Sequence, residues 1–379
     1  MTHLDDLLEQ EFPVADNYIY LNHAAVAPWP SRTGTAVRQF AAQNVDMGAR
    51  DYPVWLAAEQ GLRTALARFI NAASADDIAL LKNTSEGLSV IAHGYPWNSG
   101  DNVVICDEEF PSNRIVWESL AARGVTVRSV PVQGIEDPEL ALLAAMDGNT
   151  RMLSVSSVQF ASGLRLDLAR LGHGCRAKGV AFCVDAIQGL GVLVHDVQAM
   201  HIDFLVADAH KWLLGPEGIA VFYCAARWRE RLALHAYGWR MTEDHLNFDR
   251  RDWQPAHTAR RFECGSPNML GIHALAASLT LLVEIGPKEI QRRVVGNADY
   301  LFDAIRQRPY LELITSPAPG RYAGIVTFRH TQVANDILYR QLASHNVVCA
   351  QRGGGIRFSP HFYNRHDALE AALEFTDIR

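Results

Sequence analysis

Short apolar runs alternate with amphipathic stretches between about residues 75 and 225. Each run is apolar throughout, which is typical of strands that are buried on both faces of a sheet. The amphipathic stretches between the runs predict helices that cover those faces. The predicted strands are Ile78–Leu81, Val103–Cys106, Thr126–Val130, Met152–Val155, Ala181–Val184, Phe204–Ala207 and Ile219–Tyr223.

Helix signals stand between these strands. Asp137 and Asp167 occupy N-cap positions, and Pro138 suits the first turn of a helix. The alternation of strands and helices predicts an α/β fold with a mostly parallel sheet, in which ligands bind beyond the carboxyl ends of the strands. The predicted helices are Ser85–His93, Ser112–Ala122, Pro138–Met146 and Leu168–Lys178.

A smaller α+β domain is predicted over residues 286–379, after the helix break at Gly286-Pro287. We expect residues 16–285 to form the large domain and residues 1–15 to pack on the small one. The predicted elements of the small domain are helices over Lys288–Arg308, Gln332–Ser344 and His366–Phe375, with strands over Gly324–Phe328 and Val347–Ala350.

Composition narrows the class of protein. Hydrophobic residues make up 49% of the chain and charged residues 20%, which is ordinary for a soluble globular enzyme. The net charge of −7 argues against nucleic acid or an anionic membrane as the main partner. No apolar run approaches the roughly 20 residues that span a bilayer, and the acidic start MTHLDDLLEQEF is unlike a signal peptide. We therefore expect a cytoplasmic protein.

The six cysteines are scattered and include no CxxC pair, so we expect them to be reduced and mostly buried. The histidines show no HExxH or similar spacing, and no metal site is predicted.

The chain has four lysines, and one of them ends an apolar run. Lys211 follows IDFLVADAH and precedes WLLG, so its apolar surroundings should lower its pKa and supply a neutral amine. Another apolar run, FCVD, ends in Asp185. An amine that forms a Schiff base and a carboxylate that keeps a ring nitrogen protonated are the needs of pyridoxal phosphate (PLP).

Four further positions have both a functional and an ordinary interpretation. Thr84 and Ser85 follow a strand at a helix start, which suits either phosphate binding or a plain N-cap. Phe110 could stack on a planar cofactor or lie in the core. Arg357 could hold a substrate carboxylate or form a surface ion pair.

Several motifs in correct order cover nearly the whole chain: YLNHAAVAP, NTSEGLSVIA, VDAIQ, AHK before GPEG, RFECGSPNMLGIHAL and IRFSPHFYN. Together they resemble the class V aminotransferase family of fold type I PLP enzymes, which includes cysteine desulfurases, kynureninase and isopenicillin N epimerase. The resemblance implies a PLP cofactor, an amino acid substrate and a homodimer whose active sites are shared between subunits.

The resemblance also implies a role for each matching residue. Lys211 forms the Schiff base, Asp185 pairs with the pyridinium nitrogen, and Gln188 contacts the phenolic oxygen. Ser266 reaches the phosphate of the neighbouring subunit. The implied cofactor residues are Thr84, Ser85, Phe110, Asp185, Gln188, His210, Lys211 and Ser266, and the implied substrate residues are Arg357 and, near the entrance, Asn22 and His23.

Two departures from the desulfurase pattern matter. Asp208 stands where desulfurases have a phosphate-binding serine, and we expect its carboxylate to point elsewhere. The loop that carries the desulfurase nucleophile has shrunk to Gly353–Ile356, and Cys349 lies before it on a predicted strand, as a core residue. We therefore predict an aminotransferase. The alternatives are a carbon–sulfur or carbon–selenium β-lyase or cysteine desulfurase-like enzyme, an amino-acid epimerase and a non-catalytic relative.

Overall fold

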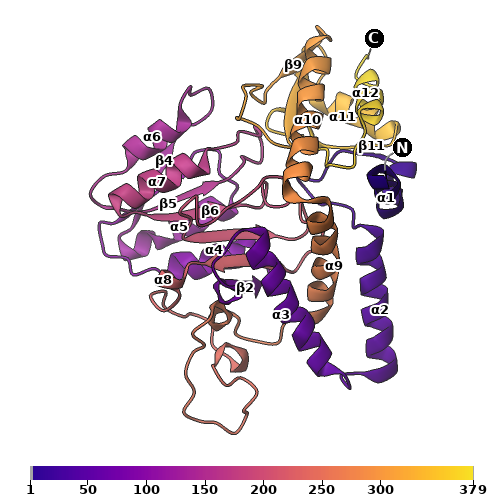
Figure 1. Ribbon diagram of the computed structural model, residues 1–379. Coiled ribbons are helices and arrows are strands. Elements are labelled where there is room, and N and C mark those ends of the chain that lie inside the picture. Colours follow the sequence, from indigo (N-terminus) through magenta and orange to yellow (C-terminus); the bar gives the residue numbers. More distant parts are fainter. Residues whose placement is uncertain (1–2, 379) are drawn as a thin grey trace.

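The structure is a computed structural model that describes residues 3–378. Its central feature is a seven-stranded sheet in the order β2-β8-β7-β6-β5-β3-β4 (Figure 1). All seven predicted strands are confirmed to within about two residues at each end. They are β2 (Ile78–Leu81), β3 (Asn102–Cys106), β4 (Thr126–Val130), β5 (Thr150–Ser156), β6 (Ala181–Asp185), β7 (Phe204–Asp208) and β8 (Ala220–Cys224).

The sheet is mostly parallel, as predicted. β3, β4, β5, β6 and β7 pair in parallel, whereas β8 runs antiparallel to both β7 and β2. The carboxyl ends of β3, β5, β6 and β7 therefore meet at one edge, which we call the sheet edge.

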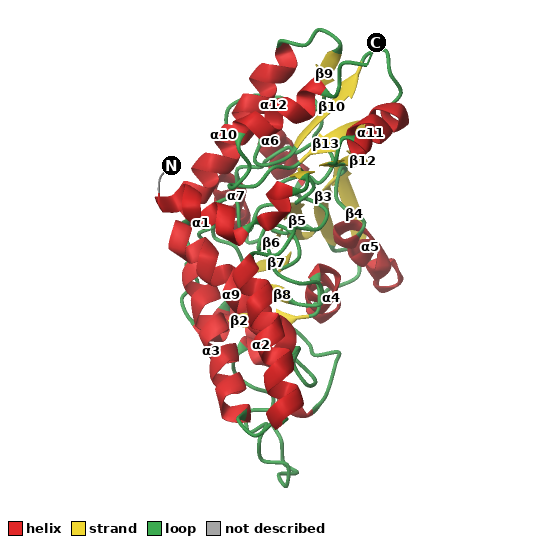
Figure 2. Ribbon diagram, turned by 90° about the vertical axis from the view of Figure 1, so that its right-hand side faces the viewer, coloured by secondary structure: helices red, strands yellow, loops and turns green. Residues whose placement is uncertain are grey.

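Helices cover both faces of this sheet (Figure 2). Along β3, Val103 and Ile105 face one buried cluster, and Val104 and Cys106 face another. Because both faces are covered, the strands have no need of polar alternation. The helices of this part are α4 (Thr84–Gly94), α5 (Ser112–Glu118), α6 (Pro138–Ala145), α7 (Leu168–Lys178) and α8 (Ala226–Arg229).

Three long helices form an outer layer against the sheet, namely α2 (Ser31–Met47), α3 (Tyr52–Phe69) and α9 (Met269–Ile285). Among residues 3–378, no single helix is long and apolar enough to cross a membrane. α9 and α10 (Pro287–Arg306) qualify only as a pair, by length and composition, with a bend of 83° between them.

The C-terminal region forms the predicted α+β unit. It has a four-stranded sheet, β12-β13-β10-β9, and a two-stranded parallel pair, β1-β11. The short strand β9 lacks a clear apolar run and was not predicted. The strand predicted over Val347–Ala350 is interrupted at Cys349, between β11 and β12. The elements are β9 (Leu311–Leu313), β10 (Val326–His330), β11 (Val347–Val348), β12 (Ala350–Arg352), β13 (Gly355–Phe358), α11 (Asn335–Ser344) and α12 (His366–Glu374).

The N-terminal segment lies against this C-terminal unit. After α1 (His3–Glu11), the ring of Phe12 stacks on Tyr363 with centroids 3.8 Å apart. β1 (Ile19–Tyr20) then pairs with β11. The chain therefore reaches the seven-stranded sheet only after it has contributed a strand to the C-terminal unit. The division into domains at residues 16 and 286 stays a prediction.

Candidate active site

Lys211 and Asp185 lie at the sheet edge on neighbouring strands. Asp185 ends β6 opposite Val206 of β7, and Lys211 follows the end of β7 by three residues. Both side chains are buried, at 1% and 9% exposed. Burial raises the pKa of Asp185 and lowers that of Lys211, while the attraction between them works against both shifts. An amine that loses its proton more readily than an ordinary lysine and a carboxyl group that gains from a positive partner therefore lie at the same edge.

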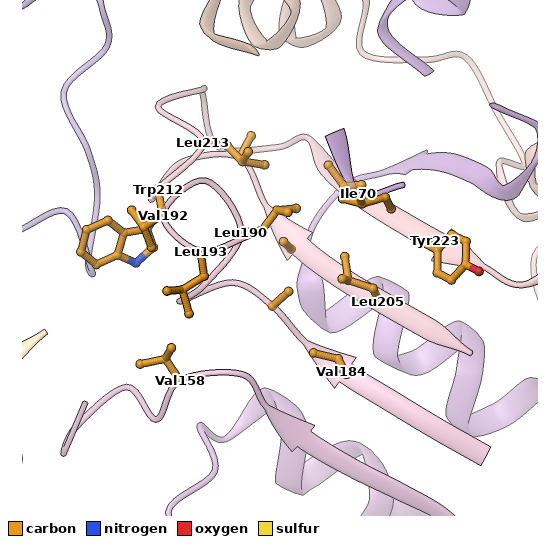
Figure 3. Packing of buried hydrophobic residues seen from close by; sticks show 14 of the residues in the cluster. Ile70, Val158, Val184, Leu190, Val192, Leu193, Leu205, Trp212, Leu213 and Tyr223 are labelled. Carbon is orange, nitrogen blue, oxygen red and sulfur yellow. The ribbon is translucent and has the colours of Figure 1, made fainter. Parts of the chain in front are cut away.

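A tight apolar turn supports these two groups. Leu190, Val192 and Leu193 pack beside Trp212 and Leu213, directly after Lys211 (Figure 3). Gly191 has φ +105°, and a Cβ there would lie 2.2 Å from the carbonyl oxygen of Trp212. Only glycine permits this approach, and it holds the backbone after Lys211 in place.

The partly exposed ring of Phe110 lies near the amine of Lys211. Its ring is 38% exposed, and the Lys211 Nζ lies 5.6 Å from the ring centroid. The ring of Phe160 meets it edge-on at 5.1 Å, which fixes its plane. An exposed aromatic face beside the reactive amine is suited to stacking on a planar ring.

Arg357 is a buried cation without an acidic partner among residues 3–378. It lies on β13, is 2% exposed, and its Nη1 donates to the carbonyl oxygen of Phe160 at 2.7 Å, while its Nε has no hydrogen-bond partner. Burial and the nearby Arg352 lower the pKa of Arg357 to about 10. This environment favours an anion and is unlike the surface ion pair that was the alternative.

Glu109 is a site residue that the sequence did not reveal. Its carboxylate is 5% exposed and accepts hydrogen bonds from the Ser156 N and Oγ at 2.7 and 2.5 Å, from the Asn113 Nδ2 at 2.8 Å and from the Gln159 Nε2 at 3.1 Å. These bonds tie the turn that carries Phe110 to the segment before Phe160. Three acidic residues in a row follow β3, and nothing in the sequence distinguishes the buried one.

The predicted phosphate cradle lies at the N-terminus of α4, and its binding of phosphate stays a prediction. Asn83 is the N-cap and accepts from the Glu86 N at 2.8 Å, so the hydroxyls of Thr84 and Ser85 are not needed as caps. The Ser85 Oγ lies 2.8 Å from the Ser112 Oγ at the start of α5.

Asp208 contradicts the expectation that its carboxylate points elsewhere. The Asp208 Oδ2 accepts a hydrogen bond from the Thr84 N at 3.2 Å, and the Asp208 N donates to the Thr84 Oγ1 at 3.1 Å. The acid therefore lies in the cradle itself, because the free N–H groups at a helix start attract it. The ring of His210 lies nearby, with its Nδ1 3.9 Å from the Asp208 Oδ2.

Gln188 is buried and hydrogen-bonded within the protein, whereas Ser266 lies at the surface. The Gln188 amide is occupied on both sides: its Nε2 donates to the Ala24 O at 3.0 Å, and its Oε1 accepts from the Trp212 Nε1 at 2.8 Å. Its contact with the phenolic oxygen stays a prediction. Ser266 is exposed, as a residue that serves a neighbouring subunit would be, and that role also stays a prediction.

His23 requires a correction. Its side chain is fully buried, with the Nδ1 2.8 Å from the Ser359 O and the Nε2 2.7 Å from the Tyr363 hydroxyl. Both ring nitrogens are used inside the protein, so His23 joins the N-terminal segment to the C-terminal unit and offers no nitrogen at an entrance. The neighbouring Asn22 forms an isolated parallel β-bridge with Ser359, and its buried side-chain Oδ1 has no hydrogen-bond partner.

The hairpin β12–β13 shows why no nucleophile is present in the shortened loop. Gly353 and Gly354 form its two-residue turn with φ +61° and +79°, the conformation of a type I′ turn. Cys349 lies in the one-residue break between β11 and β12 rather than on a strand, and is 4% exposed. Burial raises the pKa of Cys349 to about 12, so its thiol is inert.

These residues fit PLP. Asp185 matches a protonated ring nitrogen, Lys211 the aldehyde carbon, Phe110 a ring face and Arg357 a substrate carboxylate. Unpartnered buried atoms remain at the Arg357 Nε and the His210 Nδ1, where an anionic ligand would supply acceptors. No cluster among residues 3–378 resembles a metal site.

Known proteins resemble the chain over nearly its whole length. The family model described as aminotransferase class-V matches residues 19–371. A probable cysteine desulfurase from Methanothermobacter thermautotrophicus is 28% identical over 386 residues, which cover 96% of this chain and 95% of that protein.

Two solved structures of the lyase C-DES have the same fold. One is a variant with glycine covalently linked to the PLP cofactor; it superposes with a TM-score of 0.90 and 22% identity over 98% of this chain and 99% of that chain. The other, described as the cystine C–S lyase in complex with its product cysteine persulfide, superposes with a TM-score of 0.88 and 22% identity over 97% and 99%. The architecture is the fold type I of PLP enzymes.

Proposed function

Because the chain belongs to the class V aminotransferase family, we propose that this PLP-dependent enzyme is a carbon–sulfur lyase that acts on an amino acid of the cystine type. The relatives that support this activity are named as desulfurases, and a structural neighbour is named as a cystine lyase. Transamination, which we predicted from the sequence, has less support, since the missing nucleophile is equally expected of a lyase that releases its sulfur product.

One observation carries the proposal. The hairpin β12–β13 is closed by a two-residue turn, and Cys349 is buried beside it with a raised pKa. A desulfurase needs an exposed thiolate to take the sulfur atom, and Cys349 does not meet that need. The sulfur would therefore leave as part of a product. A disulfide substrate suits this outcome, because its leaving group is a stabilised persulfide.

The described residues can perform such a β-elimination. When it is bound, PLP supplies a ring that accepts the electron pair released from the α-carbon. Arg357 binds the substrate carboxylate and thereby orients the α-hydrogen. Lys211 is the base that removes this proton. Asp185 keeps the ring nitrogen protonated, and Phe110 covers one ring face. The balance is cystine plus water giving pyruvate, ammonia and cysteine persulfide.

A second subunit is part of this proposal. Ser266 is exposed, and Glu263, three residues before it, accepts a hydrogen bond from the Leu80 N of β2. The segment is thus held on the sheet while the Ser266 hydroxyl is available to a neighbouring phosphate site. Light scattering should give the mass of a dimer. Ser266→Ala should weaken cofactor binding while the protein stays dimeric. A fully active monomer would contradict this part of the proposal.

The test is a product assay with the PLP-loaded enzyme. We expect pyruvate and persulfide from cystine in a ratio of about one to one, with no sulfur adduct on the intact protein by mass spectrometry. Alanine with a 2-oxo acid serves as the transamination control. Amino-group transfer without sulfur release would favour an aminotransferase, and a persulfide on a protein cysteine would favour a desulfurase.

A further inference from the structure

Asp208 places a carboxyl group inside the phosphate cradle. It ends β7, is 8% exposed, and its Oδ2 accepts from the Thr84 N at 3.2 Å. Backbone N–H groups at a helix start are those that bind phosphate. Asp208 therefore accepts a hydrogen bond from an N–H group that would otherwise be available to the cofactor phosphate.

Two atoms of this cradle lack partners among residues 3–378. The Asp208 Oδ1 and the His210 Nδ1 are both buried without a hydrogen bond. The His210 Nδ1 lies 3.9 Å from the Asp208 Oδ2, which is too long for a hydrogen bond between them. Because unsatisfied buried polar atoms are costly, these two atoms indicate a ligand that offers them hydrogen-bonding groups.

The charges around Asp208 decide its protonation. Burial is the largest influence and raises the pKa of Asp208 to about 6. Hydrogen bonding with Thr84 and the charge of Lys211 act in the opposite direction, and Glu217 has a smaller raising effect. His210 is neutral, because burial and the nearby Lys211 lower its pKa to about 4. Asp185, on the adjacent strand, is a further acid in electrostatic contact with Asp208. An anionic phosphate entering this space would favour the neutral carboxylic acid over the carboxylate.

We propose that Asp208 binds the cofactor phosphate as a neutral carboxylic acid, which takes up one proton from solvent and donates it in a hydrogen bond to a phosphate oxygen. The acid thus replaces the serine hydroxyl of the desulfurases that the chain resembles. This inference depends on the cofactor and not on the proposed lyase reaction.

The experiment uses the unloaded full-length protein with pyridoxine 5′-phosphate and, for comparison, pyridoxine. Neither probe has an aldehyde, so neither can form a Schiff base with Lys211. The titration of Lys211 therefore does not affect binding through covalent attachment. Dissociation constants are measured by calorimetry from pH 5.5 to 8.5 for the wild type and Asp208→Asn. An asparagine has the shape of the neutral acid and cannot ionise.

We expect the two proteins to bind pyridoxine 5′-phosphate equally at pH 5.5. Above about pH 6, the wild-type dissociation constant should rise about tenfold per pH unit relative to Asp208→Asn, because each binding event must first protonate the acid. Pyridoxine should show no such difference. Calorimetry at pH 8 in buffers of different ionisation enthalpy should give about one more proton taken up by the wild type than by the variant.

Glu217→Gln is the matched control, since it removes an exposed carboxylate near Asp208 and should keep the steep wild-type profile. Parallel profiles for the wild type and Asp208→Asn would show that Asp208 does not bind the phosphate. Tighter binding by Asp208→Asn and Asp208→Ser at every pH, including 5.5, would show an acid that stays ionised and repels the ligand. Either result overturns the proposal. Should Asp208→Asn fail to fold, as judged by circular dichroism, Asp208→Ser provides the comparison.

Discussion

The sheet edge and the hairpin β12–β13 carry buried charges of opposite sign. At the sheet edge, burial raises the pKa of Glu109, Asp185 and Asp208. In the hairpin, burial lowers the pKa of Arg357. Among residues 3–378, neither Asp185 nor Arg357 forms an ion pair. Because an uncompensated buried charge is costly, we expect a ligand group of opposite charge to meet Asp185 in one region and Arg357 in the other.

The difference separates two tasks. We expect Asp185 at the sheet edge to pair with the cationic ring nitrogen of the cofactor and Arg357 in the hairpin to bind the carboxylate of the substrate. The two-residue turn of the hairpin leaves no loop for a mobile thiol. Substitutions at the sheet edge should therefore impair any reaction, whereas substitutions in the hairpin should affect substrate binding or the fate of sulfur.

The largest effect is expected from Asp185→Asn at the sheet edge. An amide cannot keep the ring nitrogen protonated, so turnover should fall by about 10²–10³-fold. The cofactor should still bind within a few-fold, because the phosphate contacts and Lys211 remain. Turnover and the absorbance of bound cofactor measure the two quantities. Near-normal turnover would mean that another group protonates the ring nitrogen.

A smaller effect is expected from Arg357→Lys in the hairpin. Lysine keeps the charge but loses the planar fork that binds a carboxylate with two hydrogen bonds. We expect kcat/KM to fall by about 10–100-fold, mainly through KM. The exposed Arg352 on the same hairpin offers a matched control, and Arg352→Lys should change kcat/KM by less than about threefold. Equal losses in both variants would refute the specific role of Arg357.

The same two regions show how far the sequence could predict the structure. The sheet edge was accessible because buried strands are apolar throughout, so Asp185 and Lys211 stood out as polar residues at their ends. Asp208 was misplaced because sequence gives its strand position but not the balance between phosphate repulsion and the attraction of the α4 N-terminus. His23 was misplaced because its partners, Ser359 and Tyr363, lie more than 300 residues away.

Glu109→Gln tests the part of the sheet edge that the sequence did not reveal. Its carboxylate accepts four hydrogen bonds, and an amide would turn one acceptor into a donor facing other donors. We expect a stability loss of about 1–3 kcal/mol in urea unfolding and a fall in turnover of about tenfold, because Phe110 and Phe160 lose their common support. Glu108→Gln, at the adjacent acid, should change turnover by less than about threefold. If Glu108→Gln lowers turnover as much as Glu109→Gln does, the hydrogen bonds of Glu109 have no particular role in turnover.

The smallest effect is expected from Cys349→Ser, beside the hairpin. The thiol is 4% exposed, and burial raises its pKa to about 12, so at neutral pH it is neither ionised nor accessible. Sulfur release from cystine should stay within about threefold of the wild type, while the buried hydroxyl should cost about 1–3 kcal/mol of stability in urea unfolding. Thiol reagents should label Cys349 slowly until the protein unfolds. Because Cys349 is buried in the break between β11 and β12, an attack on a substrate sulfur would require this segment to move and expose the thiol. Loss of sulfur release in this variant, with cofactor binding intact, would show that the segment does move, and the enzyme would then be a desulfurase.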